Sequence, residues 1–357
     1  MTRPARARID LQALQQNFAR VREAAPNSRV MAIVKANTYG HGMLNVARAL
    51  SGADAFGVAS LEEAIALREG GIGKTVVLLE GFCEPDELDL ISSYRLDTVL
   101  HHDSQIEQLR HARPSQPFSV WLKIDTGMNR LGFPAGRVPG VMRQLQELPV
   151  DRKIRFMSHL ACADELHNPF TRQQLECFEE ATRDLPGERG IANSAGILGW
   201  PDSHLDWVRP GIMLYGASPF PDRTASSLGL KPVMSLSSVL ISVKQCRKGD
   251  RVGYGGEWVC PGDRKIGIAA MGYGDGYPRH ASTGTPVLVN GKPASLIGRV
   301  SMDMIIIDLD GQTQAGVGDP VMLWGEGLPV DRVAANADTI SYQLLCGLTP
   351  RVAVDVC

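Results

Sequence analysis

The sequence predicts an α/β fold in which a (β/α)8 TIM-type barrel is followed by a smaller, mainly antiparallel β domain. Strand-like and helical segments alternate over the first two-thirds of the 357-residue chain, and eight such repeats are the number that closes a parallel barrel. After about residue 230 the segments become short and rich in Val and Ile. The expected domains are a barrel over residues 1–230, whose first few residues are candidates for pairing with the second domain, and a β domain over residues 231–357.

The barrel strands are expected where short apolar runs are bounded by turn residues, a pattern typical of strands buried on both faces. These runs are residues 30–35, 56–59, 75–80, 98–101, 119–125, 154–159, 190–194 and 205–209. An open doubly wound sheet is the alternative arrangement. A barrel requires chemically useful side chains at the carboxyl ends of its strands. Such side chains are present there: Lys35, Lys123, Asp125, His159, Asn193, Ser194 and Arg209.

Helical periodicity fills the intervals between these strands. Asp10 is a candidate cap for a helix that begins at Leu11, and Ser60 is a candidate cap for a helix over residues 61–68. Glu63 occupies the capping-box position of that second helix. Further helices are expected over residues 86–92, 104–111, 138–148 and 171–185.

The β domain is expected from short strands separated by turn signals. The strands are predicted at residues 233–243, 265–271, 286–289, 294–297, 304–309 and 320–323. Two helices, over residues 330–335 and 340–345, interrupt them.

Composition limits the classes of partner and the compartment. The formal net charge of −2 argues against nucleic acid or an anionic membrane as a partner held by charge alone. The basic N-terminus is not followed by an apolar signal region, and no apolar run approaches the length that crosses a bilayer. The seven cysteines are scattered without a Cys-x-x-Cys pair, so neither a disulfide framework nor a metal site is indicated. A cytoplasmic enzyme is expected.

Lys35 is the most informative single residue, because it ends an apolar run that is expected to be a buried strand. A desolvated lysine loses its proton more readily, and the neutral amine is the form that Schiff-base chemistry needs. A lysine whose stem packs while its amine reaches water is the alternative. Two further segments point to a site. Arg209-Pro210-Gly211-Ile212 could cradle a phosphate at the end of the eighth strand, and tyrosines are interleaved with glycines at residues 253–256 and 272–277.

Taken together, the segments resemble alanine racemase, a fold-type III family that uses pyridoxal 5′-phosphate. The resemblance covers essentially the whole chain and begins with Val34-Lys35-Ala36-Asn37-Thr38-Tyr39-Gly40-His41-Gly42. The other landmarks follow in order at residues 123–132, 157–159, 193–194, 209–216, 252–255, 272–277, 298–303 and 340–342. One departure is Thr38, where the family usually has a small Ala or Gly, so a modest local adjustment beside Tyr39 is expected.

The resemblance implies a two-base racemisation of alanine. Lys35 holds the cofactor and acts on the D-isomer, and Tyr254 acts on the L-isomer from the opposite side. A free tyrosine titrates near 10, so the base needs neighbours that lower its pKa, and the family pattern assigns this to His159. Arg209 is implied to face the pyridine nitrogen, and Arg130 to contact the cofactor and the substrate carboxylate together with the backbone of Met302. The remaining implied cofactor contacts are Tyr39, His159, Asn193, Ser194, Gly211, Ile212 and Tyr342.

The resemblance also implies a homodimer in which Tyr254 and Met302 reach the partner subunit's site from the β domain. Tyr273 and Tyr342 would narrow the entry, and Lys123 matches a position that can be carbamylated. Two alternatives stay open, namely a racemase of broader specificity and a cofactor-binding barrel without racemase activity. Supply of D-alanine for peptidoglycan and catabolism of D-alanine are both compatible with these motifs.

Overall fold

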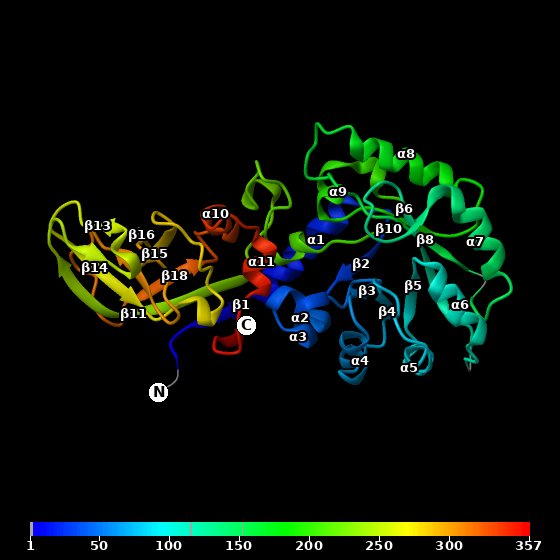
Figure 1. The fold of residues 1–357 in the computed structure, drawn as a ribbon, viewed down its shortest axis with the longest axis horizontal. Helices are drawn as coiled ribbons and strands as arrows, with labels where there is room; N and C mark the ends of the chain where they lie inside the picture. Colours follow the sequence, from blue (N-terminus) through cyan, green and yellow to red (C-terminus); the bar gives the residue numbers. More distant parts are fainter. Residues whose placement is uncertain (1–2, 115, 152) are drawn as a thin grey trace.

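The computed structural model describes residues 3–114, 116–151 and 153–357. The barrel and the β domain lie side by side along the long axis of the molecule, with the two C-terminal helices α10 and α11 near their junction (Figure 1). No helix among the described residues is long and apolar enough to span a membrane.

The first domain is a closed parallel barrel. Within the described residues its eight strands are β2 (Arg29–Ile33), β3 (Ala55–Val58), β4 (Thr75–Leu78), β5 (Asp97–Leu100), β6 (Ser119–Asp125), β8 (Arg155–Met157), β9 (Arg189–Gly190) and β10 (Trp207–Val208). They pair in chain order, and β10 closes the ring by pairing in parallel with β2. The predicted barrel is therefore confirmed, and the open doubly wound sheet is wrong. Every residue of β3 and β5 is buried, which explains the apolar runs.

Helices surround these strands (Figure 1). The helices predicted by periodicity are α1 (Leu11–Ala24), α4 (Leu61–Glu69), α5 (Glu87–Ser93), α6 (Asp103–His111), α7 (Val138–Leu145) and α8 (Phe170–Thr182). The sequence prediction omitted α2 (Lys35–Gly40), α3 (Met43–Ala49) and α9 (Ser194–Gly199). Asp10 caps α1, since its Oδ1 accepts a hydrogen bond from the Ala13 amide at 2.9 Å. The strand expected to end at Lys35 ends at Ile33, and Lys35 instead opens the turn that follows.

The second domain is built on a largely antiparallel sheet. Its strands are β11 (Met234–Cys246), β14 (Arg264–Ala269), β15 (Pro286–Val289), β16 (Lys292–Ile297), β17 (Ile305–Asp308) and β18 (Pro320–Trp324). Short elements complete this domain: β12 (Arg251–Val252), β13 (Trp258–Val259), α10 (Val330–Ala335) and α11 (Ser341–Cys346). The short strand β7 (Phe133–Pro134) belongs to the barrel, where it pairs with β6.

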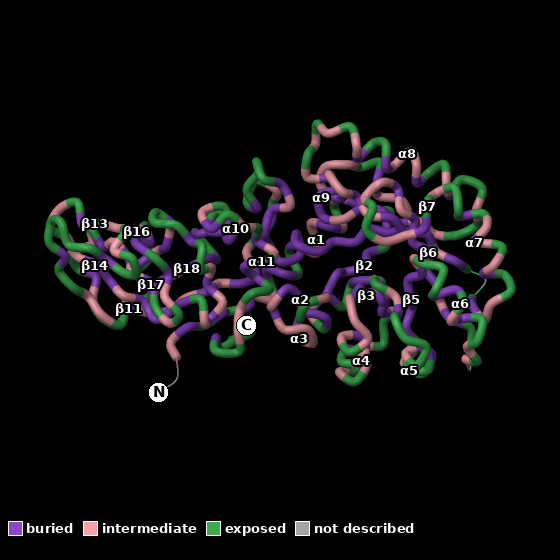
Figure 2. The backbone as a smooth tube through the Cα atoms, in the orientation of Figure 1, coloured by how far each residue is buried: buried purple, intermediate pink, exposed green. Residues whose placement is uncertain are grey.

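Both ends of the chain join the second sheet. Strand β1 (Arg6–Ile9) runs antiparallel to β11 and parallel to β19 (Ala353–Val356). Neither β1 nor β19 was predicted as a strand, because each is only four residues long and β1 is rich in arginine. One apolar cluster of buried side chains continues from the barrel into this sheet, and the buried segments run through both domains in Figure 2. The chain therefore crosses from the β domain to the barrel within its first helix.

Asp275 is a charged group at the centre of the β domain. Its side chain is fully buried, and its carboxylate binds the guanidinium of Arg3 and lies 3.3 Å from Nε of Arg351. Its Oδ2 also accepts a hydrogen bond from the Gly272 amide at 2.9 Å. The N-terminal arm is thus held against the loop that carries Tyr273.

Replacing Asp275 with Asn should lower the free energy of unfolding by about 3 kcal/mol, because two cations would lose their buried partner. Urea unfolding at fixed protein concentration measures the change. Asp355→Asn is the matched control, since the Arg6–Asp355 pair is more than half exposed at both side chains and should contribute less than about 1 kcal/mol. Equal losses in the two variants would contradict the assignment of Asp275 as a structural anchor.

Candidate active site

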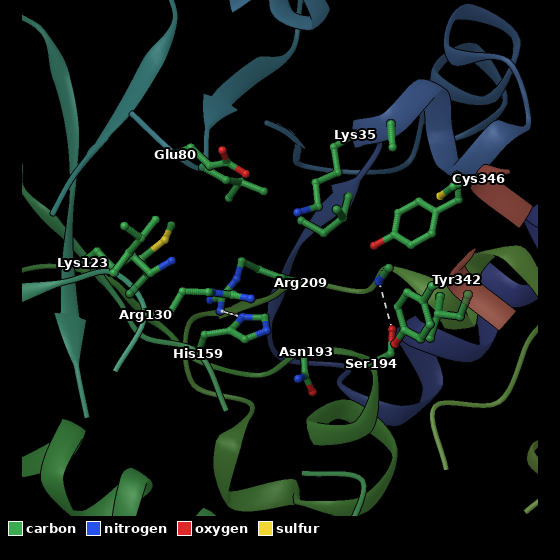
Figure 3. Close-up of a pocket in the computed structure, with 18 residues that line it drawn as sticks. Lys35, Glu80, Lys123, Arg130, His159, Asn193, Ser194, Arg209, Tyr342 and Cys346 are labelled. Carbon is green, nitrogen blue, oxygen red and sulfur yellow. Dashed lines mark hydrogen bonds between the residues drawn. The ribbon is translucent and has the colours of Figure 1, made fainter. Parts of the chain in front are cut away.

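A cavity of about 610 Å³ opens at the carboxyl ends of the barrel strands. Eleven predicted site residues line it: Lys35, Tyr39, Lys123, Arg130, His159, Asn193, Ser194, Arg209, Gly211, Ile212 and Tyr342. In Figure 3 the Lys35 amine points into the space from one side, and Arg130, His159 and Arg209 lie together across it. The strands and the loops after them thus bring together residues that are far apart in the sequence, as a parallel barrel does.

The cavity is strongly cationic. Among the described residues that line it, Lys35, Lys123, Arg130 and Arg209 carry basic side chains, and Glu80 is the acidic one. Four cations around one small space favour a ligand with several negative charges, such as a phosphate ester together with a carboxylate.

Two titratable groups in the cavity have pKa values below their ordinary ones. Burial, together with the nearby charges of Arg209, Arg130 and Lys35, lowers the pKa of Lys123 to about 8. Burial likewise lowers the pKa of His159 well below its ordinary value, with Arg209 as the next largest cause. His159 is therefore a neutral imidazole near pH 7, beside a group of fixed positive charges.

Arg209 is anchored at one side of its guanidinium and free at the other. Its Nη2 donates to the carbonyl oxygens of Ser158 at 2.5 Å and Ile191 at 3.2 Å, and it lies 3.5 Å from Nδ1 of His159. Burial lowers the pKa of Arg209 to about 10, so it stays charged at neutral pH. Its Nη1 is buried and has no hydrogen-bond partner among the described residues. An unpartnered buried N–H of a cation indicates a ligand acceptor at this position.

One part of the cavity wall is made by hydroxyl and backbone groups. Ser194 Oγ accepts hydrogen bonds from the amides of Gly211 at 2.9 Å and Met213 at 3.3 Å. A Cβ atom at Gly211 would lie 2.6 Å from the hydroxyl oxygen of Tyr39, so glycine is required there to leave room for that hydroxyl. Tyr39 itself is held by stacking on Tyr215, with ring centroids 4.6 Å apart. These groups form the kind of pocket that binds a phosphate.

The turn after Lys35 has an unusual backbone. Ala36, Asn37, Thr38 and Tyr39 all have φ between 49° and 55°, in the left-handed region that costs L-residues roughly 1–2 kcal/mol each. A Cβ at Gly40 would lie 2.2 Å from the carbonyl oxygen of Leu345, so glycine also permits the close approach of α11. The local adjustment expected at Thr38 lies within this turn, where the β-branched side chain is fully buried.

Asn193 and Asp125 support the site through the backbone. Asn193 lines the cavity, but its Oδ1 caps α9 by accepting from the Gly196 amide at 2.9 Å. Asp125 does not line the cavity. Its Oδ1 accepts from the amides of Gly127 at 2.9 Å and Asn129 at 3.1 Å, and this folds the loop that carries Arg130.

Three predicted site residues lie outside the cavity. Tyr254, Tyr273 and Met302 belong to the β domain, and 66%, 40% and 52% of their respective surfaces are exposed. None of them lines the cavity of its own chain. The structure of one chain therefore places these large side chains on an outer surface of the β domain.

Several lining residues were not predicted from the sequence. Glu80 follows β4, so the rule that useful side chains stand at strand ends would have found it. Cys346 lies on α11 and carries no sequence signal for a site. The other lining residues are apolar: Ile33, Ala36, Leu79, Leu131 and Met157. Across the part of the chain that is described, no group of three or more His, Cys, Asp or Glu side chains is arranged to hold a metal ion.

Comparison with known proteins gives one family over nearly the whole chain. Residues 9–219 match the family model for the alanine racemase N-terminal domain, and residues 233–356 match that for its C-terminal domain. The chain is 51% identical over 350 residues to an alanine racemase of Shewanella sediminis, with 98% of each protein covered. It is 50% identical over 348 residues to the biosynthetic alanine racemase of Escherichia coli, with 97% of each covered.

Solved structures of alanine racemases are also similar to this chain. The biosynthetic alanine racemase from Pseudomonas aeruginosa superposes with a TM-score of 0.97 at 46% identity, with all of both chains covered. Alanine racemase from Acinetobacter baumannii superposes with a TM-score of 0.94 at 40% identity, again with full coverage of both chains. The barrel and the β domain are therefore those of these enzymes.

Proposed function

This chain belongs to the alanine racemase family, and we propose that it interconverts L-alanine and D-alanine by a two-base mechanism. It is an amino-acid racemase, an isomerase, by its close identity to these enzymes over nearly the full chain. The proposed mechanism rests on one observation. A single cavity holds Lys35, the cations of Arg130 and Arg209, and the group of hydroxyl and backbone atoms around Ser194 and Gly211.

The residues present fit pyridoxal 5′-phosphate. Lys35 provides the amine for covalent attachment, and the cradle of Tyr39, Ser194, Gly211 and Ile212 fits the phosphate. When bound, the cofactor supplies an electron sink for the substrate Cα. Arg209 has an unpartnered buried N–H, which fits an acceptor such as the cofactor ring nitrogen. Because a guanidinium donates hydrogen bonds and accepts none, Arg209 leaves that nitrogen unprotonated.

Racemisation requires a proton to leave one face of Cα and return on the other. We assign the Nζ of Lys35 to the D-isomer and the Oη of Tyr254 to the L-isomer. In the L-to-D direction Tyr254 takes the Cα proton from one face and Lys35 donates a proton to the opposite face, and in the D-to-L direction the two groups exchange these roles. Arg130 lines the cavity and is assigned to the substrate carboxylate, which it holds by charge-assisted hydrogen bonds.

Tyr254 and Met302 require a second copy of the chain in this proposal. Both are more than half exposed on the β domain and neither lines its own chain's cavity, which supports a homodimer with shared sites. Tyr273 would join Tyr342 at the entry. A β domain with these exposed side chains argues against a cofactor-binding barrel without racemase activity.

We assign Lys123 as a site of carbamylation. The lowered pKa of its amine, to about 8, makes the neutral nucleophile available near neutral pH. Its Nζ would form a bond to the carbon of CO₂ and lose a proton, and the resulting anion would face Arg130 and orient it.

The physiological direction is proposed from relatives. Two enzymes to which the chain is similar, from E. coli and P. aeruginosa, are described as biosynthetic, so we propose that the chain supplies D-alanine for peptidoglycan. The cytoplasmic location expected from the sequence stays a prediction.

The purified holoenzyme should convert L-alanine to D-alanine and leave larger L-amino acids largely unchanged, because the cavity must hold the cofactor as well as the substrate. Chiral chromatography of a panel from L-alanine and L-serine to L-lysine and L-arginine measures this. Comparable rates with the basic amino acids would favour the racemase of broader specificity. Failure to racemise any amino acid would refute the proposed function.

A further inference from the structure

The backbone on either side of Lys35 is hydrogen-bonded to the next β/α unit of the barrel, β3 and α4. Before it, the Val34 amide donates to the carbonyl oxygen of Gly57 at 2.9 Å. After it, the Ala36 amide donates to Oε1 of Glu63 at 2.6 Å. The residues before and after Lys35 are therefore both fixed by hydrogen bonds. Val34 is bonded to the main chain of β3, and Ala36 is bonded to a carboxylate on α4.

Glu63 connects the ends of two strands. Its Oε2 accepts from the Ala59 amide at 2.9 Å, directly after β3, while its Oε1 accepts from Ala36 after β2. Half of the predicted capping box is present, because the Glu63 amide donates to Ser60 Oγ at 3.4 Å. The other half of the capping box, in which the Glu63 carboxylate would accept from the Ser60 amide, was predicted wrongly. The carboxylate accepts instead from the amides of Ala59 and Ala36, and Ala36 is distant in sequence.

The turn after Lys35 has backbone hydrogen bonds of its own, such as the one from the Thr38 amide to the Val34 carbonyl oxygen at 3.1 Å, and Glu63 adds a side-chain acceptor for its Ala36 amide. From Ala36 to Tyr39 the chain is left-handed, a conformation that L-residues adopt only when surrounding contacts impose it. Asn37 Oδ1 accepts from the Met43 amide at 3.0 Å, and His41 Nδ1 lies 2.8 Å from the Tyr39 carbonyl oxygen. These contacts hold the later part of the turn, whereas Glu63 holds its first residue.

The shape of this turn decides where two functional groups point. Lys35 and Tyr39 are four residues apart, so one helical turn of either hand carries both to the same face. Both line the cavity. A shift of the backbone at Ala36 would therefore move the amine relative to the cradle and to the guanidinium groups, which are held by other strands.

We propose that Glu63 is a positioning residue, whose carboxylate fixes the Lys35 turn so that the amine is held in the geometry that proton transfer requires. This inference rests on the proposed role of Lys35. Two N–H donors converge on the two oxygens of one carboxylate, so an amide in its place accepts only one of them and directs its own N–H group at the other. Glu63→Gln, which keeps size and shape, is for this reason a severe change at this position.

The expected effect falls on kcat more than on KM. Arg130 and Arg209 are assigned to the substrate and the cofactor ring, whereas the carboxylate of Glu63 accepts from the Ala36 and Ala59 amides. We expect Glu63→Gln to lower kcat for L-alanine about ten- to a hundredfold, as small displacements of reacting groups do. KM should stay within about twofold of wild type. Glu62→Gln is the matched control, since Glu62 is an exposed carboxylate in the same first turn of α4 and should leave both constants unchanged.

A second readout needs no bound cofactor. In the full-length protein freed of pyridoxal phosphate, hydrogen exchange of the peptide that covers residues 35–42 should be about tenfold or more faster in Glu63→Gln than in Glu62→Gln. Peptides from β6 and β8 should exchange at the wild-type rate, which separates loosening of this turn from general unfolding.

Faster exchange in this peptide together with a selective loss of kcat would support the proposal. It would be overturned by unchanged exchange, by unchanged kcat, or by an equal loss of kcat in Glu62→Gln. Borohydride reduction of the wild-type holoenzyme, followed by peptide mapping, tests the role of Lys35 separately. A label on another lysine would refute the proposed function and this inference with it, whereas a label on Lys35 with a normal Glu63→Gln variant would refute only the inference.

Discussion

Replacing Lys35 with alanine should abolish racemisation and the covalent attachment of pyridoxal phosphate. Acid–base catalysis alone contributes roughly 10²–10⁴-fold, and this variant loses covalent capture of the cofactor as well, so turnover should fall by at least about 10⁴-fold. Racemisation in both directions measures the first loss. Borohydride reduction followed by peptide mapping measures the second, because only the wild-type peptide containing Lys35 should carry the pyridoxyl label.

A lysine outside the cavity provides the control for this variant. Lys74 lies between α4 and β4 and does not line the cavity, so Lys74→Ala should keep both the label and the activity. Residual turnover within about tenfold of wild type in Lys35→Ala, without added amine, would show that another group captures the cofactor. The proposed mechanism would then be wrong at its first step.

The second large effect is expected from Tyr254→Phe. The variant should bind the cofactor normally, because Tyr254 is not among the residues assigned to the cofactor and phenylalanine removes only the hydroxyl. Exchange of the Cα proton of L-alanine in deuterated water should slow roughly 10²–10⁴-fold, while exchange from D-alanine, which is assigned to Lys35, should continue. Proton NMR of each isomer measures the two rates. Equal rates from the two isomers would contradict the two-base assignment.

Mixed dimers test whether Tyr254 acts in the second subunit. In a dimer of one Lys35→Ala chain and one Tyr254→Phe chain, shared sites would leave one site with both bases and one with neither. Random assembly makes half of the dimers mixed, so a mixture of two inactive proteins should regain about a quarter of wild-type activity. Each variant taken through the same mixing procedure by itself is the control, since neither should regain activity. No recovery on mixing would contradict the shared site.

Much of the barrel could be predicted because its signals are local. The apolar runs mark strands whose residues are buried on both faces, and Asp10 and Ser60 mark helix starts with side-chain caps that the structure contains. The rule that parallel strands end at one rim then groups Lys35, His159 and Arg209 from the sequence alone. Pairing of the first few residues with the β domain was expected, but β1 and β19 were not predicted as strands, because each is only four residues long and their pairing depends on partners more than 200 residues away.

The local backbone at the site could not be predicted. No residue from Ala36 to Tyr39 is a glycine, so the sequence offers no reason to expect a left-handed turn. The turn exists because distant groups hold it, and the Glu63 carboxylate, which the sequence suggested as part of a helix cap, is one of them. The lowered pKa of Lys123 likewise depends on cations that come from other strands and loops.

The sequence by itself determined the order of strands and helices, the set of residues at the strand ends and the family to which they belong, because periodicity, capping and motif spacing are all written along the chain. Only the tertiary structure decided which of those side chains share a cavity and which N–H of Arg209 is left without a partner. It also decided that Tyr254 and Met302 face outward. These properties arise from distances between segments that are remote in sequence, and such distances exist only once the barrel has closed and the β domain has packed against it.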